Sequence, residues 1–177
     1  MRIEIDKKGT KAFYKETVNV LSQYRQLLYK PDDKLKDNFK KNIFLTVAML
    51  LIFVINLIGG INQGFSVMIV LILVFAGFAI AATAVYMVKM NKMVNAYLAD
   101  DHPSVVTIDE EGIEIEKTGS QAVRLAWDNV AFVRSFAEST CFFSKDLSGI
   151  VLSVTNDHKK ELLDYIKENK IDVKVVR

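Results

Sequence analysis

The residues best suited to chemistry are few and lie far apart in the sequence. Cys141 is the only cysteine, and His102 and His158 are the only histidines. A cysteine nucleophile needs a basic neighbour that lowers its pKa, but Thr140 and Phe142 flank Cys141. We therefore expect Cys141 to pack as a small hydrophobic residue. We expect His102 in a loop and His158 in the first turn of a helix, both at ordinary exposed positions.

Enzyme motifs are missing from the sequence. It contains no glycine-rich phosphate loop, no paired-carboxylate or nucleophile motif, and no spacing typical of metal ligands. We therefore predict no catalytic, metal-binding or cofactor-binding residue, and a protein that is not an enzyme. Trp127 could anchor a partner, but its position beside the apolar stretch NVAFV fits a core residue better.

Carboxylates crowd one short stretch in the second half of the chain. They are Asp109, Glu110, Glu111, Glu114 and Glu116, opposed by Lys117 and Arg124. An acidic surface repels phosphate, so we expect no specific phosphoinositide binding there. Residues 89–177 carry a net charge of −3, which argues against nucleic acid as a partner. A solvated strand end is the simplest interpretation of these acids unless a basic partner is found.

Two apolar runs occupy the middle of the chain, and residues 42–88 contain no charged residue or histidine. Ile43–Ile61 has 19 residues and Phe65–Val88 has 24. As helices these runs would be roughly 28 and 36 Å long, against roughly 30 Å of bilayer hydrocarbon. We predict a transmembrane helical hairpin over residues 42–88, because a soluble protein of this size could not surround two helices that are apolar on every face.

Lysines flank the hairpin and indicate its orientation. Lys36, Lys40 and Lys41 precede the first run, Lys89 and Lys92 follow the second, and the link GGINQG has none. Cationic residues near span ends stay on the cytoplasmic side. We therefore predict a multi-pass cell-membrane protein with both termini in the cytoplasm. These lysines would also attract anionic lipid weakly, by about 1 kcal/mol each.

Small residues in the second run predict a helix-packing face. Gly77 and Ala81 form a small-xxx-small pair, a spacing that lets two helices approach closely. This face could pack within the hairpin or join two molecules, and Asn56 could make a polar contact. We favour packing within the hairpin, because two spans without an ionisable residue make a poor transport path.

Four segments are predicted: an N-terminal strand and helix (1–41), the hairpin (42–88), a helical extension and linker (89–103), and a cytosolic domain (104–177). Apolar spacing predicts a helix over residues 11–28, and a second short helix should lead into the membrane. Glycine residues should turn the link between the spans. From Ser104, alternating runs predict an antiparallel sheet, closed by a helix that Asn156 or Asp157 caps and followed by a last strand. The fold class is therefore α+β.

The stretch TIDEEGIEIEKTGSQAVRLAWDNVAFV, with Gly112 at its turn and Trp127 before the apolar strand, resembles the YcxB-like family. These are small bacterial membrane proteins with two spans and a C-terminal domain of pleckstrin-homology-like type. The order of segments is similar along nearly the whole chain. The resemblance implies the topology and a pleckstrin-homology-like domain, and it carries over no catalytic residue.

We expect a membrane-anchored, non-enzymatic interaction module. Its cytosolic domain would bind an unidentified protein, or a second copy of the chain, at the inner leaflet. The alternative is an accessory or immunity-type subunit whose hairpin docks onto a transporter or a membrane-active toxin. Residues 1–41 carry +5 and residues 89–177 carry −3. We therefore also expect the N-terminal helix to pack on the emerging end of the second span or on the sheet, as one unit, with the first strand at a sheet edge.

Overall fold

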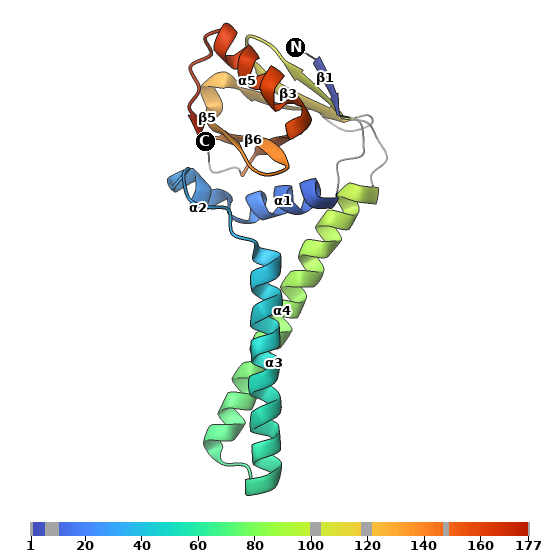
Figure 1. Ribbon diagram of the computed structural model, residues 1–177, viewed down its shortest axis with the longest axis vertical. Coiled ribbons are helices and arrows are strands. Elements are labelled where there is room, and N and C mark those ends of the chain that lie inside the picture. The colour runs from blue at the N-terminus through green and yellow to red at the C-terminus, as the bar shows by residue number, and fades with distance from the viewer. Residues whose placement is uncertain (1, 6–10, 100–103, 118–121, 147–148, 177) are drawn as a thin grey trace. The chain divides into compact units, whose positions relative to one another are not determined.

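The computed structural model describes residues 2–5, 11–99, 104–117, 122–146 and 149–176. The chain is α+β and forms two compact units, whose elements are labelled in Figure 1. Residues 1–36 and 94–177 together form one unit, called the sheet unit below. Residues 37–93 form the other, called the hairpin unit. The two sequence segments on either side of the apolar hairpin therefore fold together.

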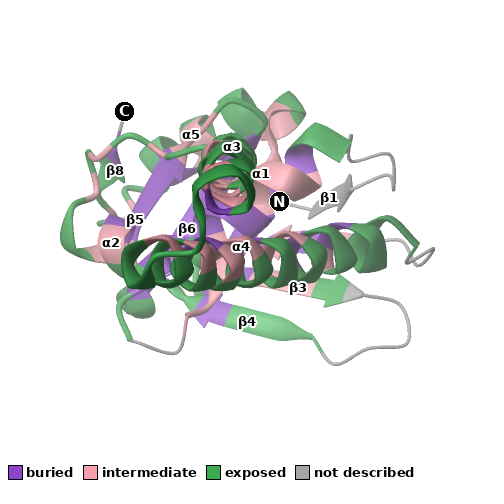
Figure 2. Ribbon diagram, turned by 90° about the horizontal axis from the view of Figure 1, so that it is seen from below, coloured by how far each residue is buried: buried purple, intermediate pink, exposed green. Residues whose placement is uncertain are grey.

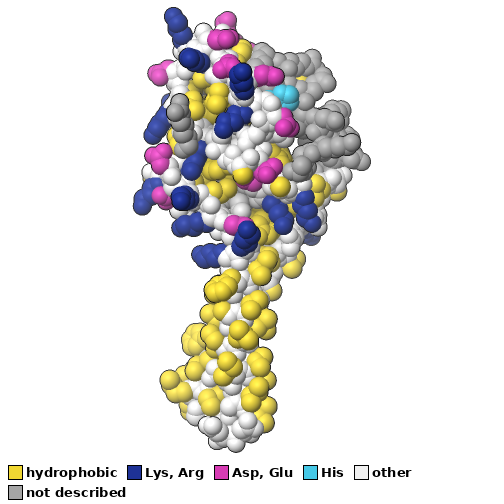
Figure 3. Space-filling view, viewed as in Figure 1, with side chains coloured by type: hydrophobic (Ala, Val, Ile, Leu, Met, Phe, Trp, Pro, Cys, Tyr) yellow, Lys and Arg dark blue, Asp and Glu magenta, His cyan; other side chains and the backbone are white. Residues whose placement is uncertain are grey.

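Two long apolar helices dominate the hairpin unit, α3 (Asn38–Gln63) and α4 (Val67–Ala99). Both are long and apolar enough to cross a membrane, with mean hydropathies of 2.5 and 2.7 in their most apolar windows. Only 6% of each window is buried, and Figure 3 shows hydrophobic side chains over the hairpin surface. The last residues of α4 belong to the sheet unit, so the expected continuation of this helix beyond Val88 is confirmed.

The ends of α3 differ from the sequence-based expectation. Residues 32–37 are not helical, so the expected separate short helix is wrong. The side chain of Asp37 caps α3 by accepting a hydrogen bond from the Lys40 N–H at 3.0 Å. At the other end α3 runs through Gly59 and Gly60 to Gln63. Of the expected turn glycines only Gly64 has a positive φ, +88°, and it ends the helix.

Polar and small side chains join α3 to α4. The hydroxyls of Thr46 and Thr83 lie 3.0 Å apart, one on each helix. Thr83 and Ala76 are both buried although α4 is otherwise mostly exposed. These two residues are seven positions apart, about two helical turns, and so share one face. Ala76 and Thr83 therefore mark the side of α4 that packs on α3.

Two four-stranded sheets form the centre of the sheet unit. One sheet has the order β1-β2-β3-β4 and the other β7-β6-β5-β8. All neighbours are antiparallel except β5 and β8. The expected antiparallel sheet is confirmed, and so is the pairing of the first strand, in which Ile3 lies opposite Val106. The strands are β1 (Arg2–Ile5), β2 (Ser104–Ile108), β3 (Gly112–Lys117), β4 (Val123–Ala126), β5 (Val130–Ser135), β6 (Ser139–Ser144), β7 (Val151–Thr155) and β8 (Val175–Val176).

Hydrophobic cores cover both faces of the second sheet. On one face Phe142 packs in a core that includes Leu162 and Ile166 of α5 (Lys159–Glu168). On the other face Phe132 and Phe143 pack with residues of α1 (Lys11–Ser22) and α2 (Tyr24–Tyr29). Successive strand residues point to opposite faces, so all six residues of β6 are buried. Figure 2 shows β5 and β6 largely buried and most of β4 exposed.

The N-terminal helix packs as expected but is interrupted. Of its predicted inward residues, Phe13, Val18 and Tyr24 are buried, and Leu21 and Leu28 are half-buried. The break falls at Gln23, between α1 and α2, where the side-chain amide exchanges hydrogen bonds with the backbone of Lys36 at 2.8 and 3.1 Å. The segment packs on the sheet, one of its two expected packing sites, and Tyr14 also stacks on Tyr97 of α4, the other expected site. A single helix over residues 11–28 is not observed.

Of the three residues of the C-terminal helix predicted to face inward, Leu162 and Ile166 of α5 are buried and Leu163 is half-buried. The start of this helix was predicted incorrectly, because no side chain caps α5 and a 3-10 turn over Asn156–His158 precedes it. The Asn156 amide instead donates to the carbonyls of Phe136 and Ala137 at 2.9 Å. Asn156 therefore secures the turn between β5 and β6.

Candidate interaction surface

Asp109 organises the turn between β2 and β3. Its carboxylate accepts hydrogen bonds from the N–H groups of Glu111 at 2.9 Å and Gly112 at 3.0 Å. Gly112 packs so closely on β4 that an added Cβ would lie 2.8 Å from the Cα of Ala126. Glycine is required here by the close approach of two backbones. The acids of the turn are therefore held at a defined position beside β4.

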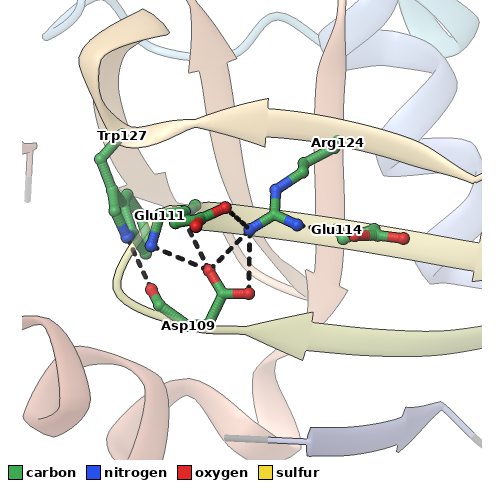
Figure 4. Close-up of polar contacts among 6 residues, drawn as sticks. Asp109, Glu111, Glu114, Arg124 and Trp127 are labelled. Atoms are coloured by element: carbon green, nitrogen blue, oxygen red, sulfur yellow. Dashed lines mark hydrogen bonds and ion pairs between the residues drawn. The ribbon is translucent and has the colours of Figure 1, made fainter.

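Arg124 on β4 gathers three carboxylates (Figure 4). Its Nη2 lies 2.9 Å from both oxygens of Asp109 and 2.9 Å from Glu111, and its Nη1 lies 3.3 Å from Glu114. Strand register explains the last contact, because Glu114 and Arg124 are cross-strand partners. These four residues are called the acidic cluster below.

The acidic cluster has a formal charge of −2, from three carboxylates and one guanidinium. The backbone N–H of Glu111 lowers the pKa of Asp109, and Gly112 and Arg124 act in the same direction. Glu111 is the most exposed member, with 81% of its side chain accessible. The cluster can therefore offer ionised acceptor oxygens to a basic group on a partner.

Trp127 supports the acidic cluster from beneath. Its ring is buried and tilted against Phe142, with ring centroids 6.1 Å apart. The indole N–H donates to the Asp109 carbonyl at 2.9 Å. The expectation that Trp127 is a core residue is confirmed. The surface residues, not the tryptophan, are available to a partner.

The lysines predicted to lie at the membrane surface are all exposed. Lys40 and Lys41 lie in the first turn of α3, Lys36 directly precedes this helix, and Lys89 and Lys92 belong to α4. The ammonium of Lys40 is 3.8 Å from Asp37. An exposed ion pair of this kind contributes little to stability. The Lys40 ammonium is therefore still available to interact with lipid.

Gly77 and Ala81 do not share one buried face. A Cβ added at Gly77 would be 3.8 Å from the ring of Phe53 on α3. Ala81 is exposed, as are Ala82 and Ala84. Within the hairpin, therefore, only Gly77 of the predicted pair faces α3. Ala81 and Ala84, three positions apart, lie on one exposed side of α4 that the hairpin itself does not cover, and Ala82 lies on another side.

Cys141 is fully buried in β6. Its sulfur lies 3.4 Å from the Ser139 hydroxyl and 3.3 Å from the Ser153 hydroxyl. Burial raises its pKa to about 11, so the thiol is neutral at physiological pH and packs as predicted. Among the described residues, no group of three His, Cys, Asp or Glu is placed to hold a metal ion.

The two histidines have different outcomes. His158 lies at the start of α5, with its Nδ1 3.5 Å from the Glu161 carboxylate. It is the N-cap residue that directly precedes the first turn of α5, and it is half-buried, so the expected exposed position is not observed. His102 lies outside the described residues.

Hydrogen bonds of three residues join the N-terminal segment to the sheet, and the sequence-based prediction did not include these hydrogen bonds. The Glu16 carboxylate accepts hydrogen bonds from the turn between β5 and β6. The Tyr24 hydroxyl donates to the Ser144 carbonyl at 2.9 Å. Buried Arg134 donates to the Asp33 carbonyl at 2.7 Å. Arg134 could have been noticed in the sequence, because it is the only charged residue in its strand. Glu16 could not, because it resembles any other charged residue on a helix surface.

Comparison with known protein families, curated proteins and solved structures finds no match for this chain.

Proposed function

We propose that this chain is a non-enzymatic, membrane-anchored interaction module. Its hairpin crosses the cell membrane, and its sheet unit binds a protein partner at the cytoplasmic surface. The observation that carries this proposal is the assembly of the sheet unit from both sides of the hairpin.

The assembly of the sheet unit from the segments before and after the hairpin supports an even number of membrane crossings. Strand β1 pairs with β2, and α1 and α2 share a core with β5 and β6, although the hairpin separates them in sequence. A single crossing would leave the two halves of one folded unit on opposite sides of the bilayer. Two crossings return the chain to the same side, as the lengths of α3 and α4 allow.

The cytoplasmic assignment rests on charge. Lysines occur where the chain enters α3 and again late in α4, whereas the residues around Gly64 carry no charge. The positive-inside rule applied to these short flanks keeps the sheet unit in the cytoplasm. The hairpin is itself the anchor. Neither a lipid modification of the chain nor contact with anionic lipid is therefore needed to hold the sheet unit at the membrane.

The architecture of the sheet unit supports a pleckstrin-homology-like domain of the YcxB-like kind. Two sheets, antiparallel except for the β5–β8 pair, follow one another, and the C-terminal helix α5 packs its apolar side into the core between them. Domains of this kind serve many functions, so the partner class is argued from the surface. The acidic cluster favours a basic protein segment, and it disfavours phosphoinositide headgroups.

Cysteine labelling tests the topology. We would introduce Asn62→Cys or Lys145→Cys separately into a Cys141→Ala background. In intact cells a membrane-impermeant maleimide should label the cysteine at position 62 and not the one at 145. In lysed cells it should label both. Labelling at 145 in intact cells would reverse the topology.

Co-purification from nanodiscs or mild detergent tests the partner surface. A Glu111→Gln, Glu114→Gln variant should lose a partner that the unchanged chain retains. The matched control is Glu168→Gln, which removes an exposed acid from α5. Equal recovery of the partner by the cluster variant and the control would contradict a role for the acidic cluster.

A second function is favoured by two exposed alanines on one side of α4, Ala81 and Ala84. Small residues at a helix surface allow close approach of another helix in the membrane. Ala81 and Ala84 would then dock onto a transporter or membrane-active toxin, which makes the chain an accessory or immunity-type subunit. Exchange of the hairpin for an unrelated one should abolish this association. It should leave binding by the sheet unit intact.

A further inference from the structure

A half-open groove of about 970 Å³ lies along one side of α5. Its opposite wall is the chain that follows this helix, up to β8. The volume is within the range of roughly 300–1,000 Å³ that is usual for small-molecule sites. In Figure 3, hydrophobic side chains bordered by Lys and Arg are visible on the upper part of the sheet unit, where α5 and the C-terminal segment lie. The groove is distinct from the acidic cluster, with which it shares no residue.

The middle of the groove is apolar. Leu163 and Ile166 contribute from α5, and Ile171, Val173 and Val175 contribute from the opposite wall. Leu163, Ile171 and Val173 are only half-buried, and Val175 is 43% exposed. The one hydroxyl in the lining, that of Ser135, already pairs with Thr140 at 2.9 Å. An occupant of the middle must therefore be apolar and needs no hydrogen-bond partner there.

The rim of the groove is cationic. Lys159, Lys167 and Lys170 line it, with Asp172 as the only acid, so its formal charge is +2. In the described part of the chain, no ion pair involves these three ammonium groups. Lys167 and Lys170 lie three residues apart at the end of α5, where their charges act on the same small volume. An anionic head at this end would complement them.

Lys170 has an unusual backbone. Its φ is +52°, which makes it the only non-glycine residue with a positive φ among those described. This position directly follows a helix end, where glycine is the common residue because other side chains are strained there. The Lys170 N–H donates to the Lys167 carbonyl at 3.2 Å and the Ile171 N–H to the Ile166 carbonyl at 3.0 Å, so the left-handed residue ends α5 in the way usual for helix C-termini. This helix end places a lysine, where glycine is common, in the lining of the groove.

We propose that this groove binds a long-chain fatty acid. The acyl chain lies against the apolar walls, and the carboxylate pairs with Lys167 and Lys170. An extended acidic peptide fits less well, because the side chains in the middle of the groove offer its backbone no hydrogen bonds. This site goes beyond the proposed function, since neither the topology nor the acidic cluster depends on it.

A photoreactive palmitate carrying a diazirine on its chain tests the site. The full chain would be reconstituted in nanodiscs of neutral phospholipid, irradiated, digested and analysed by mass spectrometry. We expect labelled peptides within residues 159–176, and competition by unlabelled palmitate. The corresponding diazirine alcohol has the same chain without the charge, and it should label these residues at least tenfold less.

Variants separate the binding site from the fold. Lys167→Gln with Lys170→Gln should reduce labelling at least tenfold, whereas Lys160→Gln, on the same helix but outside the groove, should not change it. Lys170→Gly is the decisive variant. It relieves the backbone strain, so the unfolding midpoint followed by Trp127 fluorescence should rise or stay unchanged while labelling falls.

Three outcomes would overturn the proposal. The first is equal labelling of the groove by the acid and the alcohol. The second is labelling confined to α3 and α4, which indicates simple partition into the bilayer. The third is labelling that an acidic amphipathic peptide displaces and palmitate does not, which makes the occupant a peptide. Unchanged labelling of a folded Lys170→Gly variant would show that Lys170 does not bind the carboxylate.

Discussion

The Glu16 carboxylate accepts a hydrogen bond from the Ser139 hydroxyl at 2.7 Å, across 123 residues of sequence. It also accepts hydrogen bonds from the N–H groups of Ala137 and Glu138, each at 3.0 Å. One side chain of α1 therefore satisfies three donors at the turn between β5 and β6. The membrane hairpin lies between these two elements in the sequence, so this contact joins the segments on either side of it.

Replacement of Glu16 by Gln should weaken the sheet unit. The amide keeps the shape of the carboxylate but loses its charge, and its NH₂ group would face backbone donors. We expect a loss of about 1.5 kcal/mol in the free energy of unfolding, the low end for hydrogen bonds to a charged group, because the contact is partly exposed. Urea titration of the full chain in mild detergent, followed by fluorescence of Trp127, the only tryptophan, measures this loss.

The matched control is Glu138→Gln, an exposed acid in the same turn. It should unfold like the unchanged chain, because only the backbone N–H of Glu138 takes part in the contact. Equal midpoints for Glu16→Gln and the unchanged chain would contradict the stabilising role of Glu16.

Cys141 should make stability fall at high pH. Burial raises its pKa from 9.0 to about 11, so the folded chain holds this proton more tightly than the unfolded chain. The stabilisation by the neutral thiol is complete below about pH 9 and is lost as the pH rises through 11. A shift of this size corresponds to about 2–3 kcal/mol. Unfolding of the unchanged chain and of Cys141→Ala, compared at pH 7 and 11, isolates this contribution from that of tyrosines and lysines.

The difference in unfolding free energy between these two chains should shrink as the pH rises. A constant difference across this range would show that the Cys141 thiol does not titrate with a raised pKa. A thiol reagent gives a second measurement at pH 7. The folded chain should react slowly, and the urea-unfolded chain should react quickly.

Thr46 and Thr83 should stabilise the hairpin jointly. Their hydroxyls are 3.0 Å apart, and such contacts between membrane helices contribute about 0.6 kcal/mol on average. We expect a coupling energy of this size from a double-mutant cycle of Thr46→Val and Thr83→Val. Dyes on cysteines placed at Lys41 and Lys89, in a Cys141→Ala background, report helix separation during SDS titration. Strictly additive effects of the two substitutions would show that the hydroxyls do not interact.

Gly112→Ala should destabilise the sheet unit by about 1–3 kcal/mol, the usual cost of overpacking. The added methyl would meet the backbone of Leu125 and Ala126, and backbone cannot rotate away as a flexible side chain can. Gly59→Ala is the control, because nothing lies within 4 Å of its added Cβ. Trp127 fluorescence during urea titration should report a lower midpoint for Gly112→Ala alone. An unchanged midpoint would mean that β4 shifts without cost.

Elements with a strong local pattern were predictable from the sequence. The uncharged run over residues 42–88 indicated two helices of spanning length, because burial in lipid makes every face apolar. Alternation from Ser104 onward indicated strands, and Gly112 marked a turn. The inward positions Leu162 and Ile166 of the C-terminal helix followed from helical spacing alone. In each case the information lies within a few neighbouring residues.

Details that depend on distant partners were not predictable. Asn156 looked like a helix cap, but the turn between β5 and β6 takes its side chain. The helix over residues 11–28 looked continuous, but Gln23 breaks it to bond the backbone of Lys36. Ala81 looked like the partner of Gly77, but it is exposed. In the first two cases a tertiary contact outweighed the local helix propensity. In the third case, contacts with α3 set the rotation of α4 about its own axis.

The sequence by itself determined that the chain contains an apolar hairpin and an alternating α+β region, because hydrophobic periodicity is a property of neighbouring residues. Only the tertiary structure decided that β6 is buried on both faces. One of the layers that cover it comes from α1 and α2, which lie before the hairpin in the sequence. The tertiary structure also decided that Arg124 draws three acids together and that Lys170 lines an apolar groove. These relationships join residues through space, and the folded backbone alone sets their distances.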